Sequence, residues 1–181
     1  MLIELSDYCS TRNKIKLALS TKFFNKEIKI QSINNLSQKN IYGKNLMYIK
    51  KISCSNTKIY NINHLIDMEK LVCNSNSYIH QKSIKKLTTI KNLHCELNDK
   101  IKNVNHFSKF KFLNCCFNSN IDQSGISKIR KIRTITCINN NKINNINHLD
   151  KLKNLYYASG KIKTNKVIKL KITKYTNFSE S

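Results

Sequence analysis

The apolar residues of this chain recur in short groups whose first, fourth and sixth positions are aliphatic, aromatic or cysteine. Six such triplets follow one another, and their last members are separated by 19, 22, 20, 22 and 20 residues. The triplets are Ile49, Ile52, Cys54; Met68, Leu71, Cys73; Ile90, Leu93, Cys95; Phe110, Leu113, Cys115; Ile132, Ile135, Cys137; and Leu152, Leu155, Tyr157. Side chains alternate between the two faces of a strand, so each group predicts one short strand with a buried face.

The recurring hexapeptide resembles the strand of a leucine-rich repeat, written L-x-x-L-x-L/C. This resemblance implies an α/β repeat fold, a solenoid with a parallel sheet of six to seven short strands. The intervals are too short for long helices, so we expect loops, single helical turns or short helices on the convex side. The sequence predicts that this solenoid spans residues 27–160.

A second regularity has twice the period of the first. His64, His106 and His148 are 42 residues apart, which indicates that two unequal units alternate along the chain. One residue is missing between Cys54 and Ile59 relative to later copies, and we expect this difference to lie in a loop. A triplicated histidine is not typical of a catalytic residue, so we interpret the series as a position that caps or packs a turn.

The residues between the inward-facing positions should line the concave face of the solenoid. The later strands carry apolar and aromatic residues there, which favours a docking patch for a protein partner. We predict contact area from Phe112, Asn114, Cys116, Ile138 and Tyr156, with a polar flank from Lys51, Lys70 and His94. In the alternative interpretation the solenoid merely tolerates these residues, or Phe117 packs inward.

The chain of 181 residues has a formal net charge of +23, which raises nucleic acid as an alternative partner. However, lysine far outnumbers arginine, and Lys, Asn and Ile are the residues that an AT-rich genome favours. Arginine is the side chain that reads guanine edges and forks onto phosphates. We therefore expect no specific nucleic-acid recognition, and binding to polyanions remains the alternative function.

Cysteine usage and the lack of catalytic motifs narrow the range of possible functions further. Five of the seven cysteines keep the repeat register, which predicts buried thiols in a reducing compartment. Cys116 follows Cys115 directly and is predicted to face the opposite, exposed side. We expect no metal, no cofactor and no enzymatic activity. With no run of 18 apolar residues, we also expect a soluble cytoplasmic protein.

Residues 1–26 and 161–181 differ from the repeats. Leu2 to Tyr8 and Lys14 to Phe24 predict two short amphipathic helices, a helical cap that resembles the second half of an F-box. This resemblance, together with the repeats, is to F-box and leucine-rich-repeat proteins of AT-rich giant DNA viruses of amoebae. It implies a ubiquitin-ligase substrate adaptor in a host cytoplasm, with a Skp-type linker contacting Leu5, Leu19 and Phe23. In the alternative, the segment only caps the solenoid. The final segment predicts a capping strand and tail.

Overall fold

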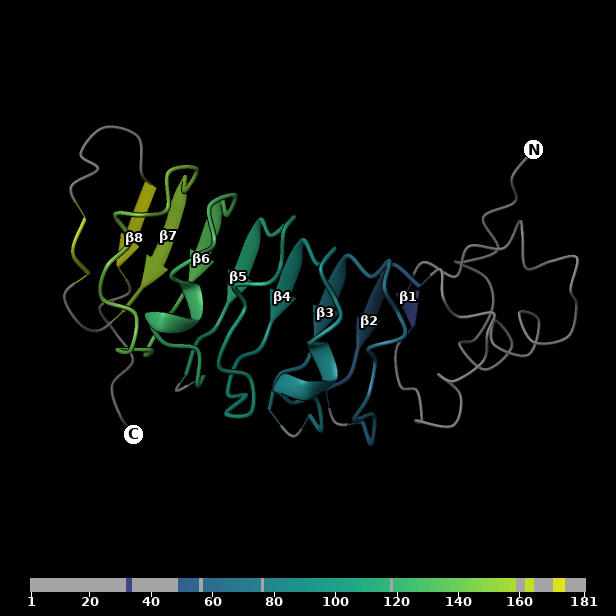
Figure 1. Ribbon diagram of the computed structural model, residues 1–181. Coiled ribbons are helices and arrows are strands. Elements are labelled where there is room, and N and C mark those ends of the chain that lie inside the picture. Colours follow the sequence, from purple (N-terminus) through teal and green to yellow (C-terminus); the bar gives the residue numbers. More distant parts are fainter. Residues whose placement is uncertain are drawn as a thin grey trace, which may run out of the picture.

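The described part of the chain forms an elongated solenoid in which short parallel strands stack in sequence order (Figure 1). This computed structural model describes residues 32–33, 49–158 apart from 56, 76 and 118, then 162–164 and 171–174. Eight strands of these residues form one sheet. They are β1 (Ser32–Ile33), β2 (Lys51–Ser53), β3 (Lys70–Val72), β4 (Asn92–His94), β5 (Phe112–Asn114), β6 (Thr134–Thr136), β7 (Asn154–Tyr157) and β8 (Lys171–Lys174).

The strand positions and their register confirm the prediction of a stacked repeat. Strands β2 to β7 all begin two residues after the first member of a triplet, and equivalent residues pair across the whole sheet. Ile52, Leu71, Leu93, Leu113, Ile135 and Leu155 are direct neighbours in the register. The sheet has eight strands: six from the triplets, β8 in the final segment where a capping strand was predicted, and β1, which adds one neighbour before the first triplet.

The interior of the solenoid consists of the triplets and the aliphatic residues of the connections. Every triplet residue except Tyr157 is at most 7% exposed. The five cysteines that keep the repeat register are all buried and free. Four of them donate their thiol, as well as their backbone N–H, to a carbonyl of the next strand, as Cys95 does to Asn114 at 3.3 Å and 2.9 Å. The cysteine column therefore adds weak hydrogen bonds to a tightly packed core.

The chain turns sharply two residues after each of the later inward cysteines. Leu97, Phe117 and Asn139 have φ angles of 54°, 53° and 53°, in the left-handed region that non-glycine residues rarely adopt. Each turn is followed by a buried polar residue. Asn98, Ser119 and Asn140 follow these three turns, and Thr57 and Ser77 are the buried polar residues at the equivalent places of the first two connections. Thr57 lies in the connection that is one residue short, which places the shorter interval in a loop as predicted.

The connections opposite the sheet, here called the convex side after the sequence prediction, carry short helical turns, as expected. Two 3-10 helices lie in the described connections, η3 (Gln81–Ile84) and η4 (Ser124–Ile126), and both belong to the same type of unit. Among the described residues, none of the helices is long and apolar enough to cross a membrane. The predicted helical cap of residues 1–26, with Leu5, Leu19 and Phe23, lies outside the described residues.

Candidate functional site

Two columns of outward-facing side chains cover the outer face of the sheet, here called the concave face after the sequence prediction. The register pairs Lys51, Lys70, Asn92, Phe112, Thr134 and Asn154 in the first column. It pairs Ser53, Val72, His94, Asn114, Thr136 and Tyr156 in the second column. Because the fold fixes every neighbour, residues about 20 positions apart in sequence meet on one surface. These are the columns that the alternation of the repeat predicts.

The centre of this face holds a contact between two predicted site residues. The rings of His94 on β4 and Phe112 on β5 lie with centroids 4.9 Å apart at an interplanar angle of 35°. Both residues are half-buried. Burial lowers the pKa of His94, and the positive charge of Lys70 lowers that pKa further. A neutral imidazole stacked on Phe112 is therefore the expected state at neutral pH, since its ordinary pKa is already 6.5.

The polar groups beside this centre belong to Asn114 and Glu96, of which the sequence analysis predicted only Asn114. Asn114 donates its side-chain amide to a carboxylate oxygen of Glu96 in the turn after β4. The backbone N–H of Glu96 in turn donates to the side-chain oxygen of Asn74 at 3.2 Å. Asn114 was predicted to contact a partner, whereas Glu96 was missed. Its signal was the position directly after an inward cysteine, where the side chain reaches the adjacent repeat.

The prediction that Cys116 faces solvent is wrong. Its side chain is buried, 2% exposed, and its sulfur accepts a hydrogen bond from the backbone N–H of Ile138 at 3.2 Å. Strand alternation ends at Cys115, and the turn at Phe117 directs Cys116 toward the adjacent repeat instead of toward the concave face. Burial raises the pKa of the Cys116 thiol to about 11, so it stays protonated and supplies no nucleophile at neutral pH.

The remaining predicted residues do not form one continuous apolar patch. Thr136 separates Asn114 from Tyr156 in the register, so Tyr156 lies two strands from the His94–Phe112 centre. Ile138 and Tyr156 are half-buried, Lys51 is exposed and Lys70 is partly exposed. The large hydrophobic side chains that are most exposed lie elsewhere, on turns and connections, namely Tyr60, Ile66, Tyr78 and Leu97.

Two of the three histidines of the series, His106 and His148, hydrogen-bond in the turns, as interpreted from the sequence. The Nε2 atoms of His106 and His148 lie 2.9 Å and 3.0 Å from the carbonyl oxygens of Ile84 and Ile126, the last residues of η3 and η4. A carbonyl only accepts, so Nε2 carries the proton and donates it. Each imidazole therefore gives a second hydrogen bond to a carbonyl that already accepts from the backbone N–H of Leu87 or Ile129.

The geometry of the concave face suits recognition by contact and hydrogen bonding. It combines half-exposed rings, a carboxylate and an amide on a rigid sheet. Among residues 49–158 and the other described positions, no three His, Cys, Asp or Glu side chains gather where they could hold a metal ion. Comparison with protein-family models and with curated proteins finds no family and no relative that matches this chain.

Proposed function

We propose that this chain is a non-catalytic scaffold of the leucine-rich-repeat type that binds a protein partner through its concave face. The observation that carries the proposal is the His94–Phe112 contact, which lies at the centre of two unbroken outward columns. Half-exposed rings on a rigid surface are typical of the residues that dominate binding energy at protein interfaces. The six strands β2 to β7 give a strip about 25–30 Å long, enough for a peptide or a small domain.

Preorganisation supports the same proposal. The side-chain amide of Asn114 is held by the Glu96 carboxylate, and the backbone N–H of Glu96 is held by Asn74, so both the amide and the turn that carries the carboxylate are positioned before a partner arrives. Fixing side chains in advance reduces the entropy lost on association. The repeat type is supported by the match of the hexapeptide to L-x-x-L-x-L/C and by the parallel stacking of its strands.

The concave face can be tested with paired double substitutions. His94→Ala with Phe112→Ala removes the central rings, and the proposal expects recovery of the copurifying partner to fall at least about tenfold. The matched control is Tyr60→Ala with Tyr78→Ala, which removes two exposed rings from the convex connections. Quantitative mass spectrometry of material copurified from host cells gives the readout. Equal recovery with both double variants would place the binding site elsewhere.

The role as a ubiquitin-ligase adaptor is a separate proposal that rests on the F-box resemblance of residues 1–26. It assigns Leu5, Leu19 and Phe23 to contact with a Skp-type linker in the cytoplasm of a host cell. The test compares the full chain with a chain that lacks residues 1–24 in affinity purification. The proposal expects Skp-type and cullin subunits with the full chain alone. Their absence from both samples would reject the adaptor role and leave the concave face untouched.

A further inference from the structure

A single carboxylate lies among the residues that the sheet presents outward. Strands β2 to β7 direct two columns of side chains to the concave face, and one further residue follows directly after each inward cysteine and after Tyr157. Glu96, directly after Cys95, is the one acidic residue of this set, and Lys51 and Lys70 are its only lysines. The lysines lie on β2 and β3, so the acidic position is near the centre of the face and the basic positions are at one end.

The chain holds the Glu96 carboxylate in place without neutralising its charge. Asn114 donates its side-chain amide to Oε1, and Asn74 accepts from the backbone N–H of Glu96 at 3.2 Å. Among the described residues, Oε2 accepts no hydrogen bond, and no Lys, Arg or His forms an ion pair with this carboxylate. A carboxylate offers about four acceptor positions, and Asn114 uses one of them. Glu96 is half-buried, so water screens its charge less than at a fully exposed position.

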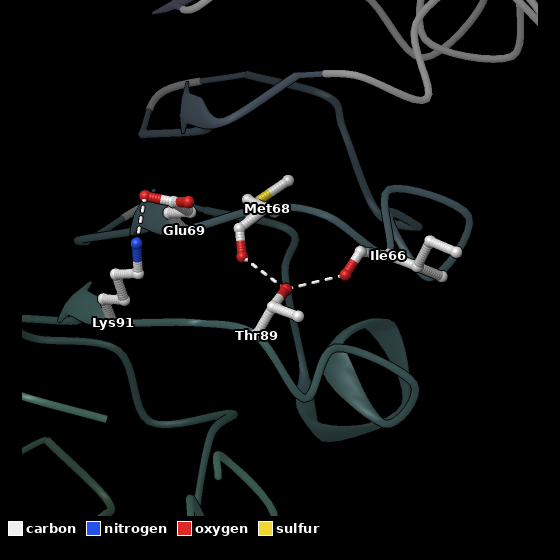
Figure 2. Close-up of polar contacts among 5 residues, drawn as sticks. All are labelled: Ile66, Met68, Glu69, Thr89 and Lys91. Carbon is white, nitrogen blue, oxygen red and sulfur yellow. Dashed lines mark hydrogen bonds and ion pairs between the residues drawn. The ribbon is translucent and has the colours of Figure 1, made fainter. Parts of the chain in front are cut away.

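Glu69 shows how a carboxylate of this solenoid is neutralised when it joins two repeats. Its carboxylate lies 2.8 Å from Nζ of Lys91 on the adjacent rung (Figure 2). The hydrogen bond to Lys91 is the largest cause that lowers the pKa of Glu69. The Thr89 hydroxyl, two residues before Lys91, donates to the carbonyls of Ile66 and Met68 at 2.6 Å and 2.8 Å (Figure 2). Polar groups at this edge therefore bond one rung to the next, and the charge of Glu69 is matched within the chain.

The rings of the concave face adjoin the unmatched carboxylate. The register places His94 opposite Asn114, and Phe112 precedes Asn114 by two residues on the same strand. Side chains two residues apart on a strand share a face and are about 6.6 Å apart. Because the Asn114 amide reaches the Glu96 carboxylate, the carboxylate, the amide and both rings belong to one surface. Burial lowers the pKa of His94, so its imidazole is neutral at neutral pH and does not supply the matching positive charge.

These groups select a planar cation. The carboxylate favours a positive charge, and an aromatic face attracts a cation that lies within about 6 Å of the ring centroid. A guanidinium satisfies both, because it donates in a fork to carboxylate oxygens and stacks on aromatic rings, whereas an ammonium is a compact and strongly hydrated point charge. A metal ion with oxygen ligands needs several such groups at once. The described part of the chain gathers no three His, Cys, Asp or Glu side chains for that purpose.

We propose that Glu96 and Phe112, here called the arginine site, form a docking site for an arginine side chain of the protein partner. The guanidinium donates to Oε2 of Glu96 and lies over the Phe112 ring, while Asn114 keeps the carboxylate in position. This inference rests on the proposed function, because it assigns a partner side chain to the centre of the concave face. It adds a selectivity that net charge opposes, since a chain of +23 attracts acidic ligands at long range whereas this site selects a basic residue.

The test selects peptides against the full-length protein at physiological salt, where charges more than about 8 Å apart are largely screened. The probe is a displayed library of random peptides about nine residues long, which in extended form cross a strip of roughly 30 Å. Counterselection on the His94→Ala, Phe112→Ala double variant removes peptides that bind elsewhere or through net charge, since both proteins carry the same charge at neutral pH. The proposal expects arginine in the surviving peptides to be enriched at least about threefold over the input library, and more than lysine.

Paired changes in the protein and the peptide locate the arginine. Glu96→Gln keeps an acceptor oxygen for Asn114 and removes the negative charge, so it should unfold at the temperature of the parent chain and bind the surviving peptides at least about tenfold more weakly. With citrulline, a neutral side chain of the same shape, in place of the peptide arginine, the parent and this variant should bind equally to within about twofold. The matched control is Glu69→Gln, which makes the same change in net charge at a carboxylate already paired with Lys91 and should leave affinity within about twofold. Isothermal titration calorimetry with the purified peptides measures these affinities.

The outcomes separate this inference from the proposed function. Surviving peptides without excess arginine, or equal losses with Glu96→Gln and Glu69→Gln, would overturn the arginine site and leave the concave face as a binding surface. Equal binding of peptides with lysine in place of arginine would overturn the choice of a guanidinium. If no peptide survives the counterselection, the arginine site and the proposed function of the concave face both fail.

Discussion

Two kinds of junction alternate between the stacked units, and they differ in the polar residue at their buried position. In the first kind, here called the asparagine junction, a buried asparagine joins its own unit to the preceding one. The side-chain amide of Asn98 donates to the carbonyl of Cys73, and that of Asn140 donates to the carbonyl of Cys115. In the second kind, the serine junction, Ser77 or Ser119 occupies the equivalent buried position. A half-buried asparagine in the connection makes a bond between units there, as Asn105 does to Ser124 at 2.8 Å.

The asparagine junction is the more completely bonded of the two. Asn98 donates to the carbonyls of Cys73 and Ile79 at 2.7 Å and 3.3 Å. Its side-chain oxygen accepts from the N–H groups of Lys100 and Ile101 at 2.9 Å and 3.2 Å. Ser119 instead lies 3.9 Å from the sulfur of Cys95, a weak contact. Side-chain amides therefore make the 42-residue pair of units, and not the single repeat, the structural unit of this solenoid.

Among the substitutions that test this difference between junctions, removal of a buried amide should change the free energy of unfolding most. Asn98→Ala leaves two buried carbonyls and two N–H groups without their partner, so we expect a loss of about 3 kcal/mol in the free energy of unfolding. Ser119→Ala, the control in the serine junction, should cost about 1 kcal/mol or less. Urea denaturation followed by circular dichroism measures both. Similar losses in the two variants would mean that the junctions are energetically equivalent.

The serine junction should be more sensitive to added volume than to lost hydrogen bonds. A Cβ atom on Gly125 would lie 2.0 Å from the backbone oxygen of Lys102, in the preceding unit. Because a backbone must shift to admit it, we expect Gly125→Ala to lower the free energy of unfolding by about 2 kcal/mol. The equivalent position two units earlier is Ser83, whose hydroxyl donates to the carbonyl of Tyr60.

Ser83 therefore supplies the control for the glycine substitution. Ser83→Gly removes a hydrogen bond without adding volume, and should cost about 1 kcal/mol. The same urea titration gives both values. If Gly125→Ala were neutral, the approach of the two units at this junction would be looser than the structure indicates.

Relief of turn strain should stabilise the asparagine junction. Leu97 holds a φ angle of 54° directly before Asn98 and is 54% exposed, whereas Asn139 occupies the equivalent position before Asn140. Asparagine tolerates the left-handed region better than leucine, so Leu97→Asn should raise the free energy of unfolding by about 0.5–1 kcal/mol. The reverse change, Asn139→Leu, should lower it by a similar amount. A shift of the same sign in both variants would contradict this explanation.

The smallest expected effect is a dependence of the free energy of unfolding on pH. Burial lowers the pKa of His106, and the bond to the carbonyl of Ile84 opposes that shift only in part. In the unfolded chain the histidine takes up its proton near pH 6.5, so the contribution of His106 to the free energy of unfolding is fully present above that pH. It declines as the pH falls from there toward the lower pKa of the folded state.

His106→Gln keeps a donor for Ile84 but does not titrate, so its stability should decline less over this range. The comparison is a series of urea midpoints between about pH 5 and 7, where Asp and Glu stay ionised. His94, whose pKa is also lowered by burial, should retain its share of the decline in this variant. Identical slopes for the parent chain and the variant would rule out His106 as a source.

The strand columns of the candidate site were predictable, whereas the contacts within them were not. Two-residue alternation placed Phe112, Asn114 and His94 on the outward face, since alternation depends only on backbone geometry. The assignment of Cys116 failed because alternation stops where the chain enters a left-handed turn. Asn98 and Asn140 were missed because a polar residue in a connection does not reveal in sequence whether it is buried, and Glu96 because its bond to Asn114 depends on side-chain reach between repeats. The 42-residue spacing of Asn98 and Asn140 was a usable signal.

By itself the sequence determined that the chain stacks as a repeat, which residues face inward, and that two types of unit alternate, because periodicity along the chain translates directly into position on a stacked sheet. Only the tertiary structure decided which side chains of adjacent units meet. The His94–Phe112 contact, the buried amides and the Glu69–Lys91 ion pair all join residues about 20 positions apart in sequence. Such contacts depend on turn geometry and side-chain reach, which the repeat pattern does not encode.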